Sequence, residues 1–238
     1  MPTAVFWQAG AQPEEALDGL ATTSAPVGRL QFSMVLSNSV MVRKVFSLGH
    51  RTRVWVYSEE EKVKMEFMDL VRDRYSERFF DSRPVEEEKV QKILEAGRLV
   101  PTACNYQPQR FYLIRSKEGL AKLKSVTPFH YNVPLMILVC YDAREVWTNP
   151  GDRYYENYNS GEQDASIAAT TMMYEAETLG VHTIWIRGFD SKTVVDTYGL
   201  PQYMIPVMML GLGYPNERAK ANAWHYKRNP LEEFVTEL

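Results

Sequence analysis

Four short segments of the sequence combine cationic, hydroxyl and amide side chains in ways that suit a polar or anionic ligand. In residues 74–78 (RYSER), two arginines flank Ser76. Guanidinium groups bind phosphate oxygens through paired hydrogen bonds, and a serine hydroxyl adds a neutral one. In residues 226–230 (YKRNP), Lys227 and Arg228 form a second basic pair that could serve the same anion. The alternative for both segments is a solvated basic surface.

A third segment, residues 101–108 (PTACNYQP), falls between an expected helix and an expected strand. Thr102, Asn105 and Gln107 could form hydrogen bonds to a polar ligand, and their small neighbours permit close approach. The segment could equally be an ordinary connecting loop, because Pro and Asn are common turn residues.

The fourth segment, residues 180–190 (GVHTIWIRGFD), predicts a buried strand that ends near a glycine. α/β proteins bind ligands beside the carboxyl ends of strands. Gly188 would let a flat ring lie against the backbone. The alternative is a strand-terminal turn.

Apolar patterns predict the elements that would position these segments. Apolar residues at i, i+3, i+4 and i+7 indicate helices, and continuous apolar runs indicate strands buried on both faces. The expected helices are 65–74, 85–100, 117–124, 162–179 and 194–198. The expected strands are 110–115, 134–141, 181–186 and 206–212. Strands that alternate with helices predict an α/β sheet covered by helices on both faces.

Composition narrows the class of function. The 238 residues are 45% hydrophobic and 24% charged, as in an ordinary globular protein. A net charge of −3 leaves no excess of Lys and Arg to neutralise phosphates, which argues against a nucleic-acid partner. No apolar run approaches the roughly 20 residues of a membrane-spanning helix. Two cysteines are too few for a disulfide framework, and four scattered histidines lack zinc-ligand spacing, so we expect a reducing cytoplasm and no metal.

Residues 1–64 lack clear periodicity and the apolar core of a signal peptide. Three interpretations stay open: a small extra element, a disordered tail, or an over-long gene start. Residues 59–62 (EEEK) have purine-rich codons, which would resemble a ribosome-binding site ahead of Met65 or Met68. We therefore expect an N-terminal extension (1–64) and a folded domain (65–238). An N-terminal mass measurement on the native protein tests the start, and intact residues 1–64 would contradict it.

Four stretches, taken in order, resemble the FMN-dependent nitroreductase family. They are RYSER, PTACNYQP, GEQDASIAATTMMYEAETLGVHTIWIRGF and KRNPLEE, and they span roughly residue 65 to the C-terminus. The resemblance implies an α+β sandwich in which helices flank a central mixed sheet, assembled as an intertwined homodimer. It also implies bound FMN, NADH or NADPH as the electron donor, and a small organic acceptor such as a nitroaromatic or a quinone.

The same resemblance assigns residues to the flavin. Residues implied for its phosphate and ribityl chain are Arg74, Ser76 and Arg78, with Tyr75 alongside and Lys227 and Arg228 as a second clamp. Residues implied to reach it from the neighbouring subunit are Pro101, Thr102, Asn105 and Gln107. Residues implied to lie along one side of the isoalloxazine ring, near N5, are Trp185, Ile186, Arg187 and Gly188. Many members of the family have a small or acidic residue in place of Arg187, so this arginine either favours anionic acceptors or points to solvent.

In this interpretation the flavin carries the redox chemistry, and no side chain is assigned as acid, base or nucleophile. No GxGxxG follows an expected strand, so the nicotinamide nucleotide would bind transiently over the flavin, which predicts ping-pong kinetics. We expect Cys104 to be a small buried hydrophobe rather than a redox thiol. The aromatic residues of 147–158 would contact the acceptor or pack in the dimer interface. Two alternatives remain: a flavin-binding sensor or store without turnover, and a relative specialised in flavin cleavage or reductive dehalogenation.

Overall fold

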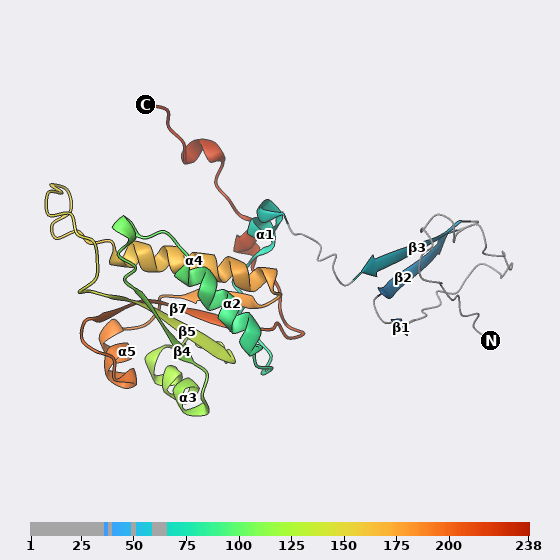
Figure 1. Cartoon of the computed structure of the whole chain (residues 1–238), viewed down its shortest axis with the longest axis horizontal. Helices are drawn as coiled ribbons and strands as arrows, with labels where there is room; N and C mark the ends of the chain where they lie inside the picture. The colour runs from blue at the N-terminus through green and yellow to red at the C-terminus, as the bar shows by residue number, and fades with distance from the viewer. Residues whose placement is uncertain (1–35, 38–39, 49–50, 59–65) are drawn as a thin grey trace. The chain divides into compact units, whose positions relative to one another are not determined.

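The computed structural model describes residues 36–37, 40–48, 51–58 and 66–238 (Figure 1). The chain divides into two compact units, Met1–Lys64 and Met65–Leu238. In the first unit, β1 (Leu36–Ser37), β2 (Val40–Leu48) and β3 (Arg51–Ser58) form an antiparallel sheet in the order β1-β2-β3. The hypothesis of a later start rests on residues 59–65, which lie outside the described residues.

The second unit contains the helices and strands expected from the sequence, with small shifts in their bounds. Its helices are α1 (Phe67–Asp73), α2 (Glu87–Arg98), α3 (Lys117–Val126), α4 (Gly161–Thr178) and α5 (Ser191–Tyr198). Its strands are β4 (Gln109–Ile114), β5 (Leu135–Asp142), β6 (His182–Ile186) and β7 (Met204–Gly213). Short 3₁₀ helices are η1 (Ala103–Asn105), η2 (Ala223–Tyr226) and η3 (Leu231–Glu233).

Local sequence explains where several helices begin and end. α2 has Glu87 and Glu88 in its first turn, where the helix dipole favours negative charge. α3 begins at Ser116, whose hydroxyl accepts a hydrogen bond from the Gly119 amide at 3.0 Å. α4 ends before Gly180, whose φ of 69° lies in the left-handed region that favours glycine.

The four strands of the second unit form one sheet in the order β4-β5-β7-β6, and every pairing is antiparallel. Leu138 pairs with Tyr112 on one side and with Met209 on the other, so β5 lies inside the sheet. The expected α+β arrangement is confirmed, but within this chain the sheet is antiparallel where we expected a mixed one. A continuous apolar run indicates that both faces of a strand are buried, and it carries no information on strand direction.

Helices cover both faces of this sheet (Figure 1). Ile137 and Val139 of β5 belong to a core cluster with residues of α2 and α4, whereas Met136 and Leu138 belong to a second cluster with residues of α3 and α5. This alternation follows from the pleat, because successive side chains of a strand point to opposite faces. The sheet therefore has an apolar layer on each side, and its polar groups are confined to its ends and to the segments that leave them.

The start of α4 packs so closely on the sheet that it has no room for a side chain. A Cβ added to Gly161 would lie 2.6 Å from Cγ and Cε2 of Tyr141, whose ring is buried. We therefore expect Gly161→Ala to lower the free energy of unfolding by about 1–3 kcal/mol, as measured by denaturant titration. Gly151→Ala is the matched control, because its nearest neighbouring atom is 3.6 Å away. Equal stability of the two variants would contradict the prediction.

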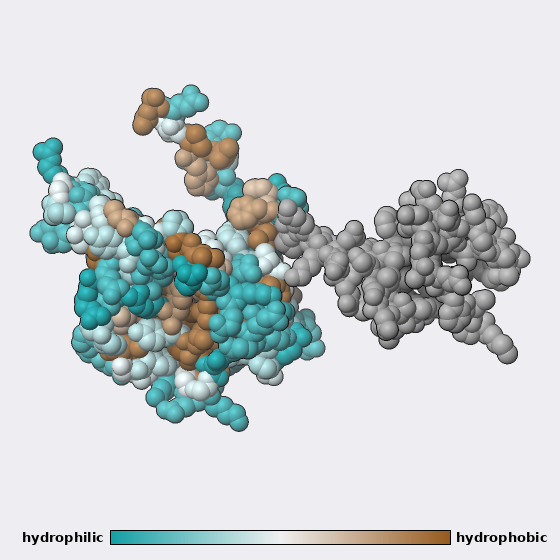
Figure 2. All heavy atoms as spheres, viewed as in Figure 1, coloured by the Kyte–Doolittle hydropathy of each residue, from teal (hydrophilic) through white to brown (hydrophobic). Residues whose placement is uncertain are grey.

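The C-terminal segment, residues 222–238, begins against the body of the second unit at η2 and then extends away from it (Figure 1). Figure 2 shows apolar residues along it. The exposed fractions of its large apolar residues include 70% for Leu231, 71% for Phe234 and 57% for Val235. Exposed apolar side chains gathered on one short segment are typical of a surface that packs against another molecule.

Candidate functional site

The RYSER segment (residues 74–78) docks on strand β6 through a backbone hydrogen bond. The Glu77 amide donates to the Thr183 carbonyl at 2.9 Å. The Glu77 side chain is fully buried and organises the segment around itself. Its carboxylate accepts hydrogen bonds from the amides of Arg78 and Phe79, both at 2.7 Å, and from the Tyr75 hydroxyl at 2.8 Å. Glu77 thus shapes the turn that presents the two arginines, a role we did not assign from the sequence although the residue lies within the motif.

The two arginines of the RYSER segment differ in their surroundings. Arg78 is exposed, and its Nη1 donates to the Ser76 carbonyl at 3.0 Å. Arg74 is half-buried, and its Nε is buried without a hydrogen-bond partner among the described residues. A buried donor with no acceptor is costly, and a guanidinium nitrogen is best satisfied by a carboxylate or phosphate oxygen. The position of Arg74 therefore fits an anion-binding site.

Two ionisable side chains lie beside the RYSER segment. Glu177 of α4 and His182 of β6 have side chains that are 10% and 27% exposed, with Oε2 of Glu177 4.0 Å from Nδ1 of His182. Burial raises the pKa of Glu177 to about 7, and burial lowers the pKa of His182. Burial thus opposes charge on both groups, and because it favours neutral His182, we do not interpret this contact as an ion pair near neutral pH.

Tyr75 of the first segment contacts both the fourth segment (residues 180–190) and the 3₁₀ helix that leads into the second segment (residues 226–230). The Tyr75 ring lies 5.6 Å from the ring of His182 and 6.2 Å from that of His225, which belongs to η2. Lys227 and Arg228 follow directly, and both are exposed. Nη1 of Arg228 donates to the carbonyls of Trp224 and Lys227, at 3.1 and 2.7 Å. Lys227 and Arg228 therefore directly follow η2, the short helix whose His225 contacts Tyr75.

The fourth segment (residues 180–190) contains β6 and the residues that follow its end. Trp185 is half-buried, Ile186 is buried, and Arg187 and Gly188 are exposed. Because the Ile186 side chain is part of the core, only its backbone is available to a ligand. The Arg187 guanidinium lies 4.9 Å from the centre of the Phe189 ring, where a cation is attracted by the aromatic face.

The Gly188 backbone is fixed by the loop that precedes β5. The Thr127 hydroxyl donates to the Gly188 carbonyl at 2.7 Å. A Cβ at Gly188 would lie 2.5 and 2.6 Å from two carbons of the Phe129 ring. The Phe129 ring therefore lies so close to the backbone at position 188 that a glycine is required there.

The PTACN loop (residues 101–107) is exposed and unusual in its backbone. Three of its non-glycine residues have φ in the left-handed region: Cys104 at 49°, Asn105 at 59° and Gln107 at 49°. Cys104 is exposed in this chain, so our expectation of a buried hydrophobe is wrong here. The reason is that the loop projects beyond the end of the sheet and does not fold back on the core. Pro101 is exposed as well.

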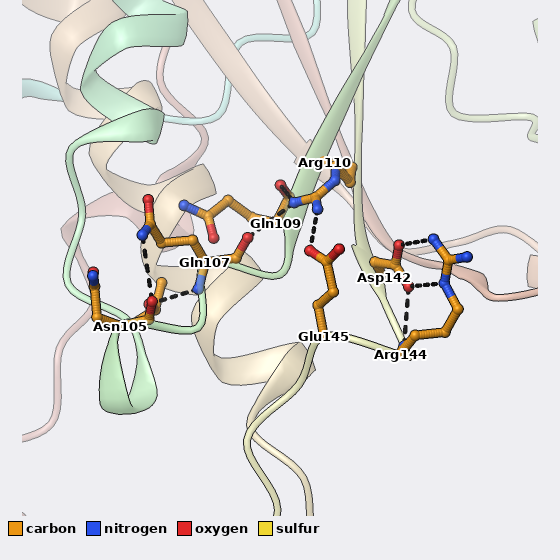
Figure 3. A network of polar contacts seen from close by, with 8 residues as sticks. Asn105, Gln107, Gln109, Arg110, Asp142, Arg144 and Glu145 are labelled. Atoms are coloured by element: carbon orange, nitrogen blue, oxygen red, sulfur yellow. Dashed lines mark hydrogen bonds and ion pairs between the residues drawn. The ribbon is translucent and has the colours of Figure 1, made fainter.

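Side-chain hydrogen bonds hold the PTACN loop in shape. The Gln107 amide donates to the Thr102 hydroxyl oxygen at 3.0 Å, and Nε2 of Gln107 donates to the Asn105 carbonyl at 3.3 Å (Figure 3). Asp164 of α4, which is buried, accepts from the Ala103 amide at 3.0 Å and from the Ser160 hydroxyl at 2.7 Å. Asp164 ties the loop to the start of α4, and nothing in the local sequence pattern had singled it out.

The predicted segments fall into two groups in the single chain. Tyr75 of the first segment contacts η2, which leads into the second segment, and the first segment also docks on β6, which belongs to the fourth. Within residues 66–238, no hydrogen bond or ring contact joins the PTACN loop to any of them. One chain therefore presents a cluster of cationic side chains around the RYSER segment and a separate polar loop.

Beside the PTACN loop, a network of ion pairs closes the end of the sheet (Figure 3). Arg110 donates to the Gln107 carbonyl at 2.9 Å and pairs with Glu145. Asp142, which is 1% exposed, accepts hydrogen bonds from the Arg144 side chain at 2.9 and 2.7 Å. These hydrogen bonds lower the pKa of Asp142 to about 2.

Asp142 is expected to contribute to stability only in its ionised form. Its pKa in the folded chain is lowered to about 2, below that of an unfolded aspartate. The contribution is therefore present above the unfolded pKa of about 4 and is lost as pH falls through the folded value. We expect Asp142→Asn to be less stable than wild type near neutral pH, with the difference shrinking as pH falls. Asp196→Asn, at an exposed pair with Lys192, is the control; a difference for Asp142→Asn that is independent of pH would contradict the assignment.

Two further kinds of site were sought in the described part of the chain. Among these residues, no group of three or more His, Cys, Asp or Glu side chains is arranged to hold a metal ion. None of the helices that the structure describes combines the length and apolar character needed to cross a membrane.

Comparison with known proteins places this arrangement in a family. The model of the nitroreductase family matches residues 71–127 and 124–214. A nitroreductase family protein from Clostridium difficile 630 is similar in structure, with a TM-score of 0.67, 37% identity, and coverage of 72% of this chain and 98% of that one. A protein from Exiguobacterium sibiricum 255-15, solved in complex with FMN, has a TM-score of 0.62 at 23% identity and covers 73% of this chain and 98% of its own.

A sequence relative points the same way. The FMN reductase [NAD(P)H] of Bacillus subtilis strain 168 is 27% identical over 169 residues, which are 65% of this chain and 68% of the relative. The match to the family model lies within the second unit and covers three of the four segments, those at residues 74–78, 101–108 and 180–190. The chain belongs to the nitroreductase family.

Proposed function

We propose that this protein is an FMN-dependent oxidoreductase that transfers electron pairs from NADH or NADPH to a small organic acceptor, such as a nitroaromatic or a quinone. The observation that carries the proposal is the buried Nε of Arg74 on the RYSER segment, which has no hydrogen-bond partner within the part of the chain that the structure describes. Support also comes from the FMN held by the Exiguobacterium protein and from the name of the Bacillus relative.

The residues present fit a flavin mononucleotide. Its phosphate would be bound by Arg74, Ser76 and Arg78, with Tyr75 alongside and with Lys227 and Arg228 as a second source of positive charge. Trp185, Arg187, Gly188 and the Ile186 backbone would lie along the ring. Pro101, Thr102, Asn105 and Gln107 would approach from a second subunit, in agreement with the separation of the PTACN loop from the other segments in one chain. Several of these residues are exposed and so accessible to a ligand: Arg78, Arg187, Gly188, Lys227 and Arg228.

When bound, FMN would supply the hydride acceptance and two-electron delivery that side chains cannot provide. The residues of the chain bind and orient: the arginines hold the phosphate, and the end of β6 offers a backbone surface to a flat ring. The nicotinamide nucleotide and the acceptor would occupy the same open face in turn. This order predicts parallel double-reciprocal plots, and intersecting plots would contradict it.

We further propose a homodimer in which residues 222–238 cover the partner. The exposed Leu231, Phe234 and Val235 need a surface to bury them, and a two-fold pair would complete two equivalent sites. We place the flavin-binding domain at residues 65–238, with 1–64 as an extension. The two free cysteines, Cys104 and Cys140, suit a reducing cytoplasm.

The absorbance spectrum of the purified protein tests the proposed function. We expect a yellow protein whose flavin bands bleach when NADH or NADPH is added without oxygen, and whose colour returns on addition of a quinone or nitroaromatic. A protein that holds FMN but is not reduced would instead be a sensor or store. A protein that cannot be loaded with FMN would overturn the proposal.

A further inference from the structure

Tyr75 lies where the C-terminal segment meets the body of the second unit. Its ring is 6.2 Å from the ring of His225 in η2, with an angle of 67° between the two planes. Among the described residues, this is the only ring contact between residues 222–238 and the rest of the second unit. Edge-to-face pairs of this kind add attraction beyond the area they bury. The contact therefore helps to fix where the C-terminal segment leaves the body.

The ring of Tyr75 is itself held by the body of the unit. Its hydroxyl donates to Oε2 of the buried Glu77 at 2.8 Å, and its ring lies 5.6 Å from the ring of His182 in β6. Glu77 is fixed in turn by hydrogen bonds from the amides of Arg78 and Phe79, both at 2.7 Å. His225 thus packs on a ring whose own position is set by a buried carboxylate and by the edge of the sheet.

The two arginines of the RYSER segment are tied closely to this ring. Arg74 directly precedes Tyr75, and its buried Nε has no hydrogen-bond partner within the described residues. Nη1 of Arg78 donates at 3.0 Å to the carbonyl of Ser76, which directly follows Tyr75. Both guanidinium groups therefore belong to, or are bonded to, a residue next to Tyr75.

The arginine of the second basic segment has the same relation to the other ring of the pair. Nη1 of Arg228 donates at 3.1 Å to the carbonyl of Trp224, which directly precedes His225. The Arg228 side chain is thus folded back onto η2, the helix that packs on Tyr75. The position of this guanidinium depends on where η2 docks.

We propose that Tyr75 is a positioning residue that couples the two basic segments: its ring docks η2, and the docked η2 presents Arg228 to the phosphate monoester that Arg74 and Arg78 bind. The inference rests on the proposed function, because the monoester is that of FMN. Guanidinium groups from both segments would then share the oxygens of one phosphate. Without the ring of Tyr75, η2 would have to be ordered when the ligand binds, and that ordering opposes binding.

Two other roles for Tyr75 lead to different results. If its side chain contacted FMN directly, it would contribute the same affinity with or without Arg228. If it only stabilised the fold, its loss would weaken the binding of FMN and of riboflavin, which lacks the phosphate, to the same degree. A contribution that depends on Arg228 and is confined to the phosphate-bearing ligand is specific to the positioning role.

A double-mutant cycle on the flavin-free full chain tests the proposal. Quenching of flavin fluorescence gives the FMN dissociation constant of wild type, Tyr75→Leu, Arg228→Gln and the double variant. We expect each single change to weaken FMN binding about tenfold, because either one removes the charge-assisted hydrogen bond from Arg228 to the phosphate. The double variant should also be about tenfold weaker than wild type, and not about a hundredfold weaker as for two independent effects.

Three controls accompany the cycle. Riboflavin affinity should stay within about threefold of wild type in all four proteins, since no phosphate is present. Tyr75→Phe keeps the ring that touches His225, so its FMN affinity should also stay within about threefold. Tyr112→Leu removes a half-buried tyrosine from β4, at the opposite edge of the sheet from β6, and should bind FMN like wild type.

Three results would overturn the inference and leave the proposed function intact. They are effects of Tyr75→Leu and Arg228→Gln that multiply in the double variant, a single variant with wild-type FMN affinity, and an equal loss of riboflavin and FMN affinity in Tyr75→Leu. Failure of the wild-type protein to bind FMN would overturn both the inference and the proposed function.

Discussion

Replacing Arg74 with alanine is expected to weaken FMN binding by about a hundredfold or more. Arg74 is half-buried, and no residue that the structure describes accepts a hydrogen bond from its Nε, so a phosphate there would gain a charge-assisted hydrogen bond away from bulk water. Removing one partner of a buried charged pair typically costs about 2–5 kcal/mol, and 1.4 kcal/mol is about a tenfold change in affinity. Quenching of flavin fluorescence on binding measures the dissociation constant.

Arg72→Ala is the matched control for Arg74→Ala. Arg72 lies two residues earlier, on α1, and is an exposed partner of Asp69 at 3.0 Å. It should retain wild-type affinity, because it is not part of the RYSER segment. An Arg74→Ala protein that binds FMN within about threefold of wild type would show that the phosphate is held elsewhere. Riboflavin affinity should change little in either variant, since the lost contact is to the phosphate.

Introducing charge into the C-terminal segment is expected to dissociate the proposed dimer. Phe234 and Val235 are 71% and 57% exposed in one chain, and burial of such side chains contributes about 1.5–3 kcal/mol each. The double variant Phe234→Asp, Val235→Asp would remove this contribution twice in a two-fold pair. We expect the dissociation constant of the dimer to rise at least a thousandfold, which sedimentation across a range of protein concentrations can measure.

Glu237→Gln is the control for the double variant, because it changes the charge of the segment without changing its apolar surface. It should sediment like wild type. If the PTACN loop serves the site of a second subunit, the double variant should also lose FMN as it becomes monomeric. A double variant that remains a dimer would show that other surfaces hold the two chains together.

The sequence predicted the elements of the second unit well because their signals are local. The acidic first turn of α2, the apolar run of β5 and the glycine after α4 each depend on a few neighbouring residues. Strand direction depends on which strand lies beside which, and that is decided by packing across the whole chain. The two-sided burial of β5 was therefore predictable, whereas its antiparallel partners were not.

In the candidate site, too, the local features could be predicted from the sequence and the long-range contacts could not. The RYSER segment and the basic pair were visible as clusters of charge. The sequence placed Glu77 inside the motif but gave no sign that its side chain is buried. Glu177 and His182 lie about a hundred residues away from Glu77 in the sequence. They lie beside the RYSER segment because α4 and β6 bring them there, and long-range contacts of this kind leave no local sequence pattern.

The left-handed backbone of the PTACN loop limits which sequences can occupy an exposed surface. Surface positions normally tolerate most substitutions, yet Cys104, Asn105 and Gln107 each have a φ near 50–60°. A side chain branched at Cβ is strongly disfavoured there, whereas Gly, Asn and Asp are readily accommodated. In a library of variants, these three exposed positions would show the narrow residue preferences of a buried core, and Val, Ile and Thr would be depleted from them.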